Sequence, residues 1–490
     1  MEESIVSELI AATNGNCKSV AEIAELSGAI ALDMNDRLSG FRKEFCLPLC
    51  EDVETEATDT ASVRKQSSPQ SAVDRRKRCD GGVRPSAVYL CGHSLGLLPK
   101  RTRELVSVHL DLWAQLGVRA HFEGTQPWYS YEEEPIRAGG ADIVGALPHE
   151  VVYMNSLTVN LHLMMVAFYR PTTQRYRVII EKDSFPSDRC VVLSQVIHHG
   201  FDPSTAIIEI GSKSDDGSLI DFENLRSLII QHSEDVALVL LPGVHYLTGQ
   251  LLPMRELVRV VREASSEMRI GFDLAHAVGN VILRLHEWAP DFACWCSYKY
   301  LNGGPGAVAG CFVSEKHALT TDISALPRFC GWWGLERAHR FETPRLLTLT
   351  SGASSFQLSN PPILSLVPVV ASLEIFRAAG GMEVIQQKSV LLTGYLELLL
   401  ERNIGEVVEF ITPREPNNRG SQLSLRLKIA VRASRVCEKL AQRGFICDSR
   451  EPNILRVAPA PLYNSFEDVY SFARALSHVL RLDIGSPDGV

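Results

Sequence analysis

Three side chains of types that can do chemistry together lie in the segment 271–302, which reads GFDLAHAVGNVILRLHEWAPDFACWCSYKYLN. Asp273 ends an apolar run, His276 follows it closely, and Lys299 comes just after a second apolar run. If both runs are strands of an open α/β sheet, these side chains can meet in one crevice, because ligands bind at the carboxyl ends of such strands. An amine can form a Schiff base with an aldehyde, and a carboxylate can keep a pyridine nitrogen protonated. The segment therefore predicts a pyridoxal phosphate site.

Each of these residues also has an ordinary structural explanation. A lone lysine such as Lys299 usually lies on the surface, and an aspartate at a strand end, such as Asp273, usually belongs to a turn. A histidine such as His276 is more often packed than catalytic. Only the combination favours the cofactor site, and we expect no metal ion in it.

The elements that must position these residues alternate between apolar strands and amphipathic helices. The expected strands are Arg177–Glu181, Asp235–Leu241, Met268–Asp273, Phe292–Cys296 and Ala307–Val313. Between the second and the third, Met254–Ala264 has apolar residues at helical spacing. Continuous apolar strands joined by helices are typical of a mostly parallel sheet buried on both faces. We therefore expect an α/β fold.

The pattern changes after residue 360. A long helical region covers 367–402, with an interruption near Gly380 and Gly381, and residues 422–429 then alternate strictly between polar and apolar. This alternation predicts a strand with one buried face and one wet face. Two helices are expected to follow, at Ala433–Arg443 and Phe466–Leu480. Together these elements predict a smaller α+β domain.

We expect three parts in the chain. Residues 1–87 form an N-terminal segment, residues 88–360 form the large domain that binds the cofactor, and residues 361–490 form the smaller domain. Within the first part, residues 51–86 are rich in charge, serine and glycine, which is typical of a mobile insertion. The basic cluster at 75–78 is more typical of a solvated loop than of a nuclear signal or a nucleic-acid contact.

The composition of the chain restricts its possible binding partners and its cellular compartment. A net charge of -9 leaves no basic surplus for binding nucleic acid. No apolar run approaches the ~18 residues that are needed to cross a bilayer. Residues 1–20 contain three glutamates and do not have the pattern of a signal or transit peptide. The 12 cysteines lack the dense spacing of a disulfide framework. We expect a soluble cytoplasmic protein with neither nucleic acid nor membrane as a partner.

Several motifs resemble those of the kynureninase family, in the family's order. Two of them, FDLAHAVGN (272–280) and FACWCSYKYLN (292–302), lie in the segment described first. The others are LCGHSLGLLPK (90–100), MNSLTVNLHL (154–163), FPSD (185–188), GVHYLTGQ (243–250), SNPPI (359–363) and RVAPAPLYNSF (456–466). The resemblance covers most of residues 88–480, and motifs in order are far more specific than one isolated match.

The resemblance implies a fold-type-I pyridoxal phosphate enzyme, related in fold to aspartate aminotransferase. It implies hydrolysis of L-kynurenine or 3-hydroxy-L-kynurenine to anthranilate or 3-hydroxyanthranilate plus L-alanine. That reaction belongs to tryptophan catabolism by the kynurenine pathway and to de novo NAD biosynthesis. By the same resemblance Lys299 carries the cofactor and moves protons with Tyr298, Asp273 partners the pyridine nitrogen, and His276 lies near the ring.

Further cofactor contacts are implied in two groups. Within the chain they are Leu157, Thr158, Phe185, Pro186, Ser187, Asp188 and Tyr298. The pattern agrees for the first two, because residues 157–169 look like a helix whose first free N–H groups can bind an anion. From the neighbouring subunit they are Trp332 and Asn360, so the resemblance implies a homodimer with shared active sites.

The substrate is implied to meet four residues. Arg456 pairs with the α-carboxylate, a task that suits the planar guanidinium. His121, Ser94 and Asn360 lie near the rest of the substrate, and His121 with Asn360 resembles the pattern associated with 3-hydroxykynurenine. The preference between the two kynurenines stays open.

Two positions depart from the family pattern. His93 stands where the family has an asparagine, and Pro242 stands where some members have a cofactor-contacting serine; proline offers neither N–H nor hydroxyl. The alternatives to a kynureninase are another enzyme of this fold, either an aminotransferase or a cysteine desulfurase, and a non-catalytic scaffold. A desulfurase needs a reactive cysteine on a mobile loop, whereas Cys294 and Cys296 lie in an expected apolar strand.

Overall fold

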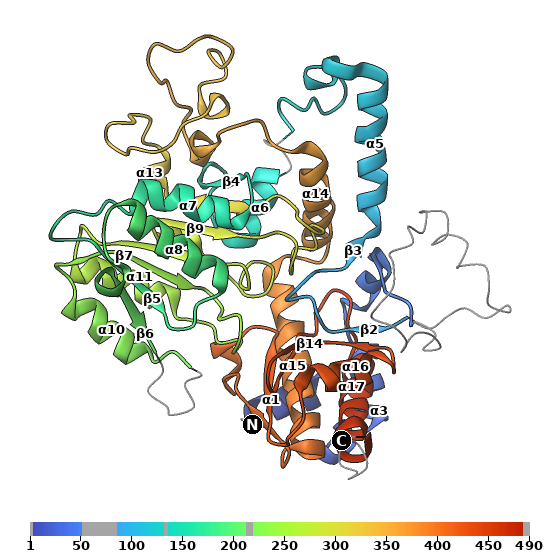
Figure 1. The fold of residues 1–490 in the computed structure, drawn as a ribbon. Coiled ribbons are helices and arrows are strands. Elements are labelled where there is room, and N and C mark those ends of the chain that lie inside the picture. Colours follow the sequence, from blue (N-terminus) through green and yellow to red (C-terminus); the bar gives the residue numbers. More distant parts are fainter. Residues whose placement is uncertain (1–2, 51–85, 132–135, 212–218, 484–490) are drawn as a thin grey trace, which may run out of the picture.

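The computed structural model describes residues 3–50, 86–131, 136–211 and 219–483. These residues form a large α/β region built on a seven-stranded sheet and a smaller region built on a four-stranded sheet (Figure 1). The insertion expected at 51–86 lies outside the described residues, apart from Ser86.

The large sheet is mostly parallel, as expected. Its strands in spatial order are β4 (Val151–Tyr153), β10 (Gly310–Val313), β9 (Phe292–Trp295), β8 (Arg269–Asp273), β7 (Val236–Pro242), β5 (Arg177–Glu181) and β6 (Ile207–Ile210). Only β10 runs against its neighbours; the other adjacent pairs are parallel. The five expected strands are confirmed, although β10 begins later than expected, at Gly310.

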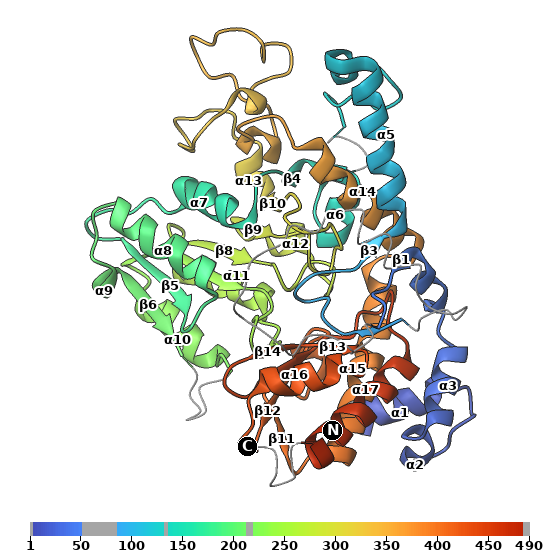
Figure 2. The same ribbon diagram turned by 45° about the vertical axis from the view of Figure 1, so that its right-hand side comes forward.

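Helices cover both faces of this sheet, because alternate residues of each strand point to opposite sides. On one face, α10 (Phe222–Gln231) and α11 (Met254–Ala264) bury apolar residues in the same cluster as Val239 and Ile270. On the other face, α7 (Leu157–Phe168) and α8 (Pro186–His198) pack in the same cluster as Leu238 and Val178 (Figures 1 and 2). The sheet is therefore a middle layer, and only its strand ends are open to a ligand.

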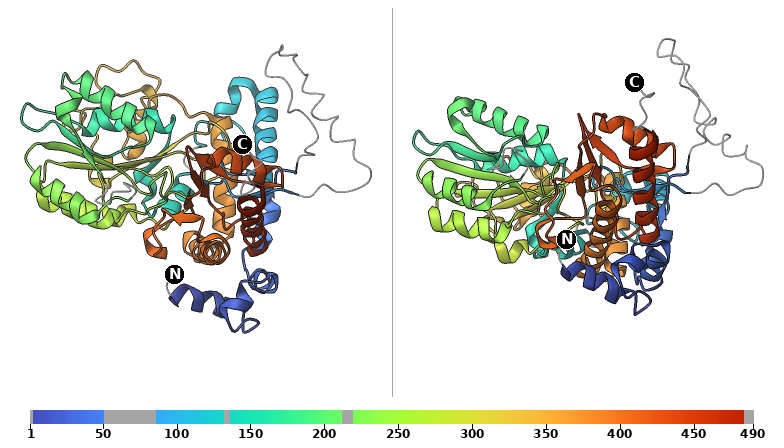
Figure 3. Two further views of the ribbon diagram at one scale, coloured as in Figure 1. Left: turned by 60° about the horizontal axis from the view of Figure 1, so that its bottom comes forward. Right: turned by 90° about the horizontal axis from the view of Figure 1, so that it is seen from below.

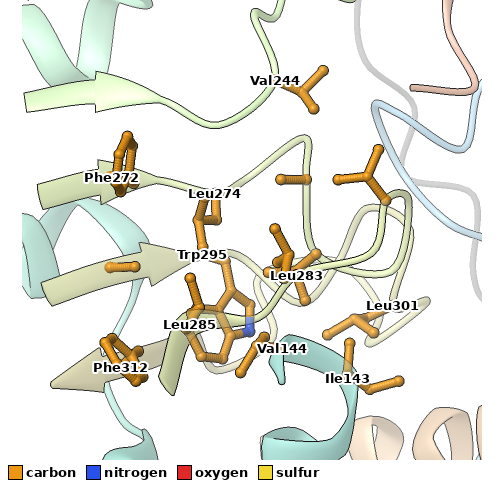
Figure 4. Packing of buried hydrophobic residues seen from close by; sticks show 14 of the residues in the cluster. Ile143, Val144, Val244, Phe272, Leu274, Leu283, Leu285, Trp295, Leu301 and Phe312 are labelled. Carbon is orange, nitrogen blue, oxygen red and sulfur yellow. The ribbon is translucent and has the colours of Figure 1, made fainter. Parts of the chain in front are cut away.

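Large side chains fill the space beside the central strands. Phe272, Trp295 and Phe312 project from neighbouring strands on the face where Ile143 and Val144 of α6 (Ala138–Val144) approach (Figure 4). All of them are at most 4% exposed. This packing holds the ends of β8 and β9 in fixed positions, which is what a site built on those ends requires.

The smaller region contains an antiparallel sheet in the order β11 (Val408–Phe410), β12 (Leu423–Leu427), β15 (Ile454–Val457) and β14 (Asp448–Arg450). It also contains α16 (Ala433–Ala441) and α17 (Phe466–His478), close to the expected helices. The N-terminal helices α1 (Glu3–Ala12), α2 (Val20–Ile23) and α3 (Leu26–Met34) share its core, and both ends of the described chain lie beside this region (Figure 3).

The long helical region is two helices, α14 (Ile363–Ala378) and α15 (Met382–Ile404). They break at Gly380 and Gly381, whose φ angles of 93° and 82° favour glycine. No single described helix is long and apolar enough to cross a membrane. By length and composition α14 and α15 pass that test only as a pair, which is bent by 81°.

The expectation of a wet face on β12 is wrong for its first half. Gln422 and Ser424 are buried, because the segment after β7 packs against them. The amide of Gln422 donates to the carbonyl oxygen of Tyr246 at 3.0 Å, and the hydroxyl of Ser424 donates to that of Leu247 at 2.5 Å. These polar side chains therefore join the small sheet to the large region.

Candidate active site

A cavity of about 270 Å³ opens at the carboxyl ends of the central strands. Glu181, Pro242 and Asp273, which end β5, β7 and β8, all reach its wall. The expected residues that line it are Leu157, Thr158, Phe185, Ser187, Asp188, Asp273, His276, Tyr298 and Lys299. The structure thus brings together in one chain most of the side chains singled out from the sequence.

Lys299 lies in the turn that follows β9 and is 8% exposed. Its amine is 2.9 Å from Nε2 of His276. Burial lowers the pKa of His276 well below its usual value, and the neighbouring positive charge of Lys299 adds to that effect. The imidazole is therefore neutral and offers Nε2 as an acceptor to the amine, while its buried Nδ1 has no hydrogen-bond partner among the described residues.

Glycine at position 96 allows the N-terminal motif to reach this turn. The N–H of Gly96 donates to the carbonyl oxygen of Tyr298 at 2.8 Å. A Cβ at this glycine would lie 2.2 Å from the carbonyl oxygen of Lys299. Any larger residue would push the lysine turn away, so the glycine of this motif supports the position of Lys299.

Three carboxyl groups lie at the cavity. Burial raises the pKa of Asp273, although Asp188, Lys299 and the N–H of Ala275 oppose it. Burial also raises the pKa of Asp188 well above its usual value, and the charge of Asp273 adds to this. Glu181, at the end of β5, has its pKa raised to about 8 for the same two reasons. A positively charged ring nitrogen beside Asp273 would offset the electrostatic repulsion between these buried carboxyl groups.

The cavity also offers an aromatic wall and an anion site. The ring of Phe185 packs edge-on against that of Tyr246, with 5.2 Å between centroids, and Lys299 Nζ lies 5.7 Å from the Phe185 centroid. The helix α7 begins at Leu157 with its first turn at the cavity wall. The side chain of its N-cap residue, Ser156, accepts no capping hydrogen bond, so the free N–H groups there can bind a phosphate.

Six of the expected residues do not line this cavity. Pro186 begins α8 beside it. Arg456 is buried in β15 and is bonded to Asp448. The remaining four are Ser94, His121, Trp332 and Asn360, which are exposed or half-buried in the single chain.

The two departures from the family pattern lie at or beside the site. Pro242 lines the cavity and pairs in register with Asp273, so the wall there carries neither a hydroxyl nor an N–H. His93 is fully buried, and its ring centroid is 6.4 Å from that of His276. Burial lowers the pKa of His93 to about 4, which keeps this imidazole neutral as well.

Sequence reasoning missed three residues of this neighbourhood. Glu181 ends an apolar strand as Asp273 does, so the rule that found Asp273 could have found it. Tyr246 lies in the motif 243–250 but carries no pattern of its own. Asp448, the partner of Arg456, lies in a short strand of half-buried residues and could be recognised only from the pairing of β14 with β15.

Comparison with known proteins identifies relatives along most of the chain. Residues 385–476 match the family described as the kynureninase C-terminal domain. A kynureninase from Koribacter versatilis is 47% identical over 389 residues, which are 79% of this chain and 89% of the relative. One from Stenotrophomonas maltophilia is 44% identical over 92% of this chain and 98% of its own length. One from Nematostella vectensis is 42% identical over 94% and 95% of the two chains.

Solved structures with the same fold include two cysteine desulfurases. The enzyme from Thermococcus onnurineus superposes with a TM-score of 0.65 at 17% identity, over 81% of this chain and 95% of that one. The enzyme from Escherichia coli has a TM-score of 0.65 at 18% identity over the same shares. At such identities the similarity concerns the fold alone.

Proposed function

The chain belongs to the kynureninase family, and we propose that Lys299 carries the pyridoxal phosphate with which this enzyme works. It is a pyridoxal-phosphate-dependent hydrolase of the fold-type-I class that cleaves a carbon–carbon bond. Its reaction converts kynurenines to anthranilates and L-alanine, within tryptophan catabolism. The observation that carries the proposal is the single cavity that joins the Lys299 amine, the Asp273 carboxylate and the start of α7.

The residues of this cavity fit the cofactor. Asp273 would hold the pyridine nitrogen protonated, Phe185 would cover one face of the ring, and the start of α7 with Thr158 would bind the phosphate. His276 and Asp188 would lie against the ring substituents. When bound, pyridoxal phosphate supplies an electron sink for the substrate carbons next to the amine.

Lys299 and Tyr298 are the groups we assign to proton transfer. Lys299 would remove the proton from Cα of the bound substrate. The neutral His276 accepts a hydrogen bond from the lysine amine and keeps it at the cavity. Burial raises the pKa of Tyr298, so its hydroxyl keeps its proton at neutral pH and can donate it as the Cβ–Cγ bond breaks.

The lysine assignment can be tested without measuring turnover. Borohydride reduction of the holoenzyme, followed by digestion and mass spectrometry, should find the reduced cofactor on the peptide that contains Lys299. Recovery of the cofactor on another lysine, for example the buried Lys388, would overturn the assignment.

We also propose that the active enzyme is a homodimer whose subunits exchange site residues. Trp332 and Asn360 do not line the cavity of their own chain, and Trp332 is 40% exposed. Its ring lies 5.6 Å from that of Phe341, which in turn lies 6.5 Å from that of Phe122. These apolar residues gather where α5 (Lys100–Leu116) and the segment 320–350 project from the same end of the molecule (Figures 1 and 2). A cluster of exposed aromatic side chains of this kind is typical of an interface.

The substrate side of the site is assigned by the family pattern. Arg456 would bind the α-carboxylate, while Ser94, His121 and Asn360 would approach the aromatic end. We propose that both L-kynurenine and 3-hydroxy-L-kynurenine are accepted, since His121 with Asn360 resembles the pattern for the hydroxylated substrate. The cysteines of the described segments are all free thiols. Free thiols are typical of proteins in a reducing compartment, and we propose the cytoplasm as the location of this enzyme.

The rival activities find little support at the site. A desulfurase needs an accessible thiol at the cofactor, but Cys294 and Cys296 are at most 3% exposed. Burial raises the pKa of Cys296 to about 11, which keeps that thiol protonated and unreactive. The scaffold alternative requires the loss of catalytic groups, whereas Lys299, Asp273 and His276 are all in place.

A further inference from the structure

The strongest unexplained contact beside the cavity joins Arg456 to Asp448 across the small sheet. The two residues face each other in register on the antiparallel strands β15 and β14. Nε of Arg456 donates to Oδ1 of Asp448 at 2.8 Å, and Nη2 donates to Oδ2 at 2.5 Å. The carboxylate therefore holds one whole edge of the guanidinium in a bidentate pair.

A third bond fixes the rotation of the guanidinium. Nη1 of Arg456 donates to the carbonyl oxygen of Tyr246 at 2.8 Å, and the same tyrosine lines the cavity. A guanidinium has five N–H groups, so these bonds leave one N–H on each terminal nitrogen for a ligand. We propose that Asp448 is a positioning residue, which orients these two N–H groups toward the α-carboxylate of the substrate and so makes the site select amino acids over amines.

Arg456 and Asp448 form a buried pair of opposite charges. Arg456 is 1% exposed, and a buried guanidinium without a counter-charge is unfavourable. Burial by itself would raise the pKa of Asp448, but the bidentate contact with the Arg456 guanidinium outweighs it and holds that pKa well below the usual range. Asp448 is thus an anion throughout the working pH range.

His93 does not compete with Arg456 for this carboxylate. Its Nε2 lies 3.7 Å from Oδ2 of Asp448, which is beyond hydrogen-bond distance, and the ring is neutral. The donor atoms of Cys91, His93 and Asp448 lie within 4.8 Å of one another, a grouping that can bind metals elsewhere. In this structure both carboxylate oxygens of Asp448 already accept hydrogen bonds from Arg456. The carboxylate of this group therefore holds the guanidinium in place.

Removal of the negative charge of Asp448 distinguishes two explanations of its effect on substrate binding, namely orientation of Arg456 and electrostatic interaction with the substrate. Asp448 opposes the attraction between Arg456 and a substrate carboxylate, because it carries the same charge as that carboxylate. If only charge mattered, Asp448→Asn would tighten substrate binding. If orientation matters, as proposed, the same change would weaken binding although it removes a repulsion.

This inference rests on the proposed role of Arg456, and the experiment therefore includes Arg456→Lys. Holoenzymes with Asp448→Asn, Asp448→Glu and Arg456→Lys are compared in steady-state kinetics with L-kynurenine. Kynurenamine, which lacks the α-carboxylate, is used as a competitive inhibitor. Glu409→Gln is the matched control, because Glu409 accepts from Arg426 at 2.9 Å in the same sheet. Cofactor absorption and thermal unfolding show that each variant is folded and loaded.

We expect Asp448→Asn to raise KM for kynurenine by about 10- to 100-fold, the loss typical of a charge-assisted hydrogen bond. It should change kcat and the inhibition constant of kynurenamine by less than about 3-fold. Asp448→Glu moves the carboxylate by one methylene and should raise KM by a smaller factor, so it tests the proposal even if Asp448→Asn does not fold. The control should behave as the wild type.

Three outcomes overturn the proposal in distinguishable ways. If Arg456→Lys raises KM while both Asp448 variants leave KM unchanged or lower it, Arg456 binds the carboxylate without help from Asp448. If Arg456→Lys also leaves KM unchanged, the role of Arg456 itself fails. Equal weakening of kynurenine and kynurenamine in Asp448→Asn would show a general loss of structure in place of positioning.

Discussion

The side-chain amine of Lys299 lies 2.9 Å from Nε2 of His276, and both groups are buried at the carboxyl end of the sheet. Because burial keeps the imidazole neutral, this contact gives the amine an acceptor without adding a charge. The amine is thereby held beside Phe185 and Asp273, in the position that a covalently bound cofactor needs.

Lys299→Ala should abolish turnover and remove the visible absorption of the bound cofactor. The loss of turnover should exceed about 1000-fold, since the residue both binds the cofactor and moves the proton. Circular dichroism and thermal unfolding should change little, because only one strand-end side chain is lost. A variant that keeps substantial kynurenine hydrolysis would contradict the assignment.

Glu181→Gln should change how stability depends on pH in the cofactor-free protein. Burial and Asp273 raise the pKa of Glu181 from its usual 4.5 to about 8. The folded protein therefore keeps a proton that the unfolded chain releases, and stability falls as pH rises from about 5 to 8. Over that range the wild type should lose about 2–4 kcal/mol more unfolding free energy than the variant.

Urea unfolding at several pH values measures this difference. Glu256→Gln is the control, because Glu256 is exposed on α11 and should leave the wild-type pH dependence intact. Parallel stability curves for the wild type and Glu181→Gln would show that Glu181 holds no additional proton in the folded state.

Trp332 should act on the cofactor site of the partner subunit. In a mixed dimer of Lys299→Ala and Trp332→Ala chains, one pocket then receives both defects and the other receives neither. Mixing the two inactive variants should restore up to about half of the wild-type activity per heterodimer, as expected for an isologous interface. If heterodimers form but remain as inactive as their parents, Trp332 acts within its own chain.

The strand-end residues show why part of this site could be predicted from the sequence. Asp273 and Lys299 follow continuous apolar runs, so their place at the open edge of the sheet follows from the pattern alone. The helix 254–264 was predicted with its observed bounds because its apolar spacing is regular and long.

Contacts between distant segments could not be predicted in the same way. Residues 422–424 look like part of an exposed strand face, and only the packing of segment 243–250 against them explains their burial. Arg456 was expected to be available to the substrate, yet its edge is held by Asp448 through a strand pairing that no local pattern reveals. Likewise, no local pattern indicates that Trp332 lies apart from the cavity of its own chain, and only the family resemblance implied it.

Product analysis tests the central claim most directly. The purified holoenzyme is incubated separately with L-kynurenine and 3-hydroxy-L-kynurenine, and the aromatic products and alanine are quantified by chromatography. We predict anthranilate or 3-hydroxyanthranilate and L-alanine in equal amounts, with neither formed by Lys299→Ala. A loaded, folded enzyme that releases no anthranilate from either substrate, or that instead transaminates them or forms alanine from cysteine, would contradict the account.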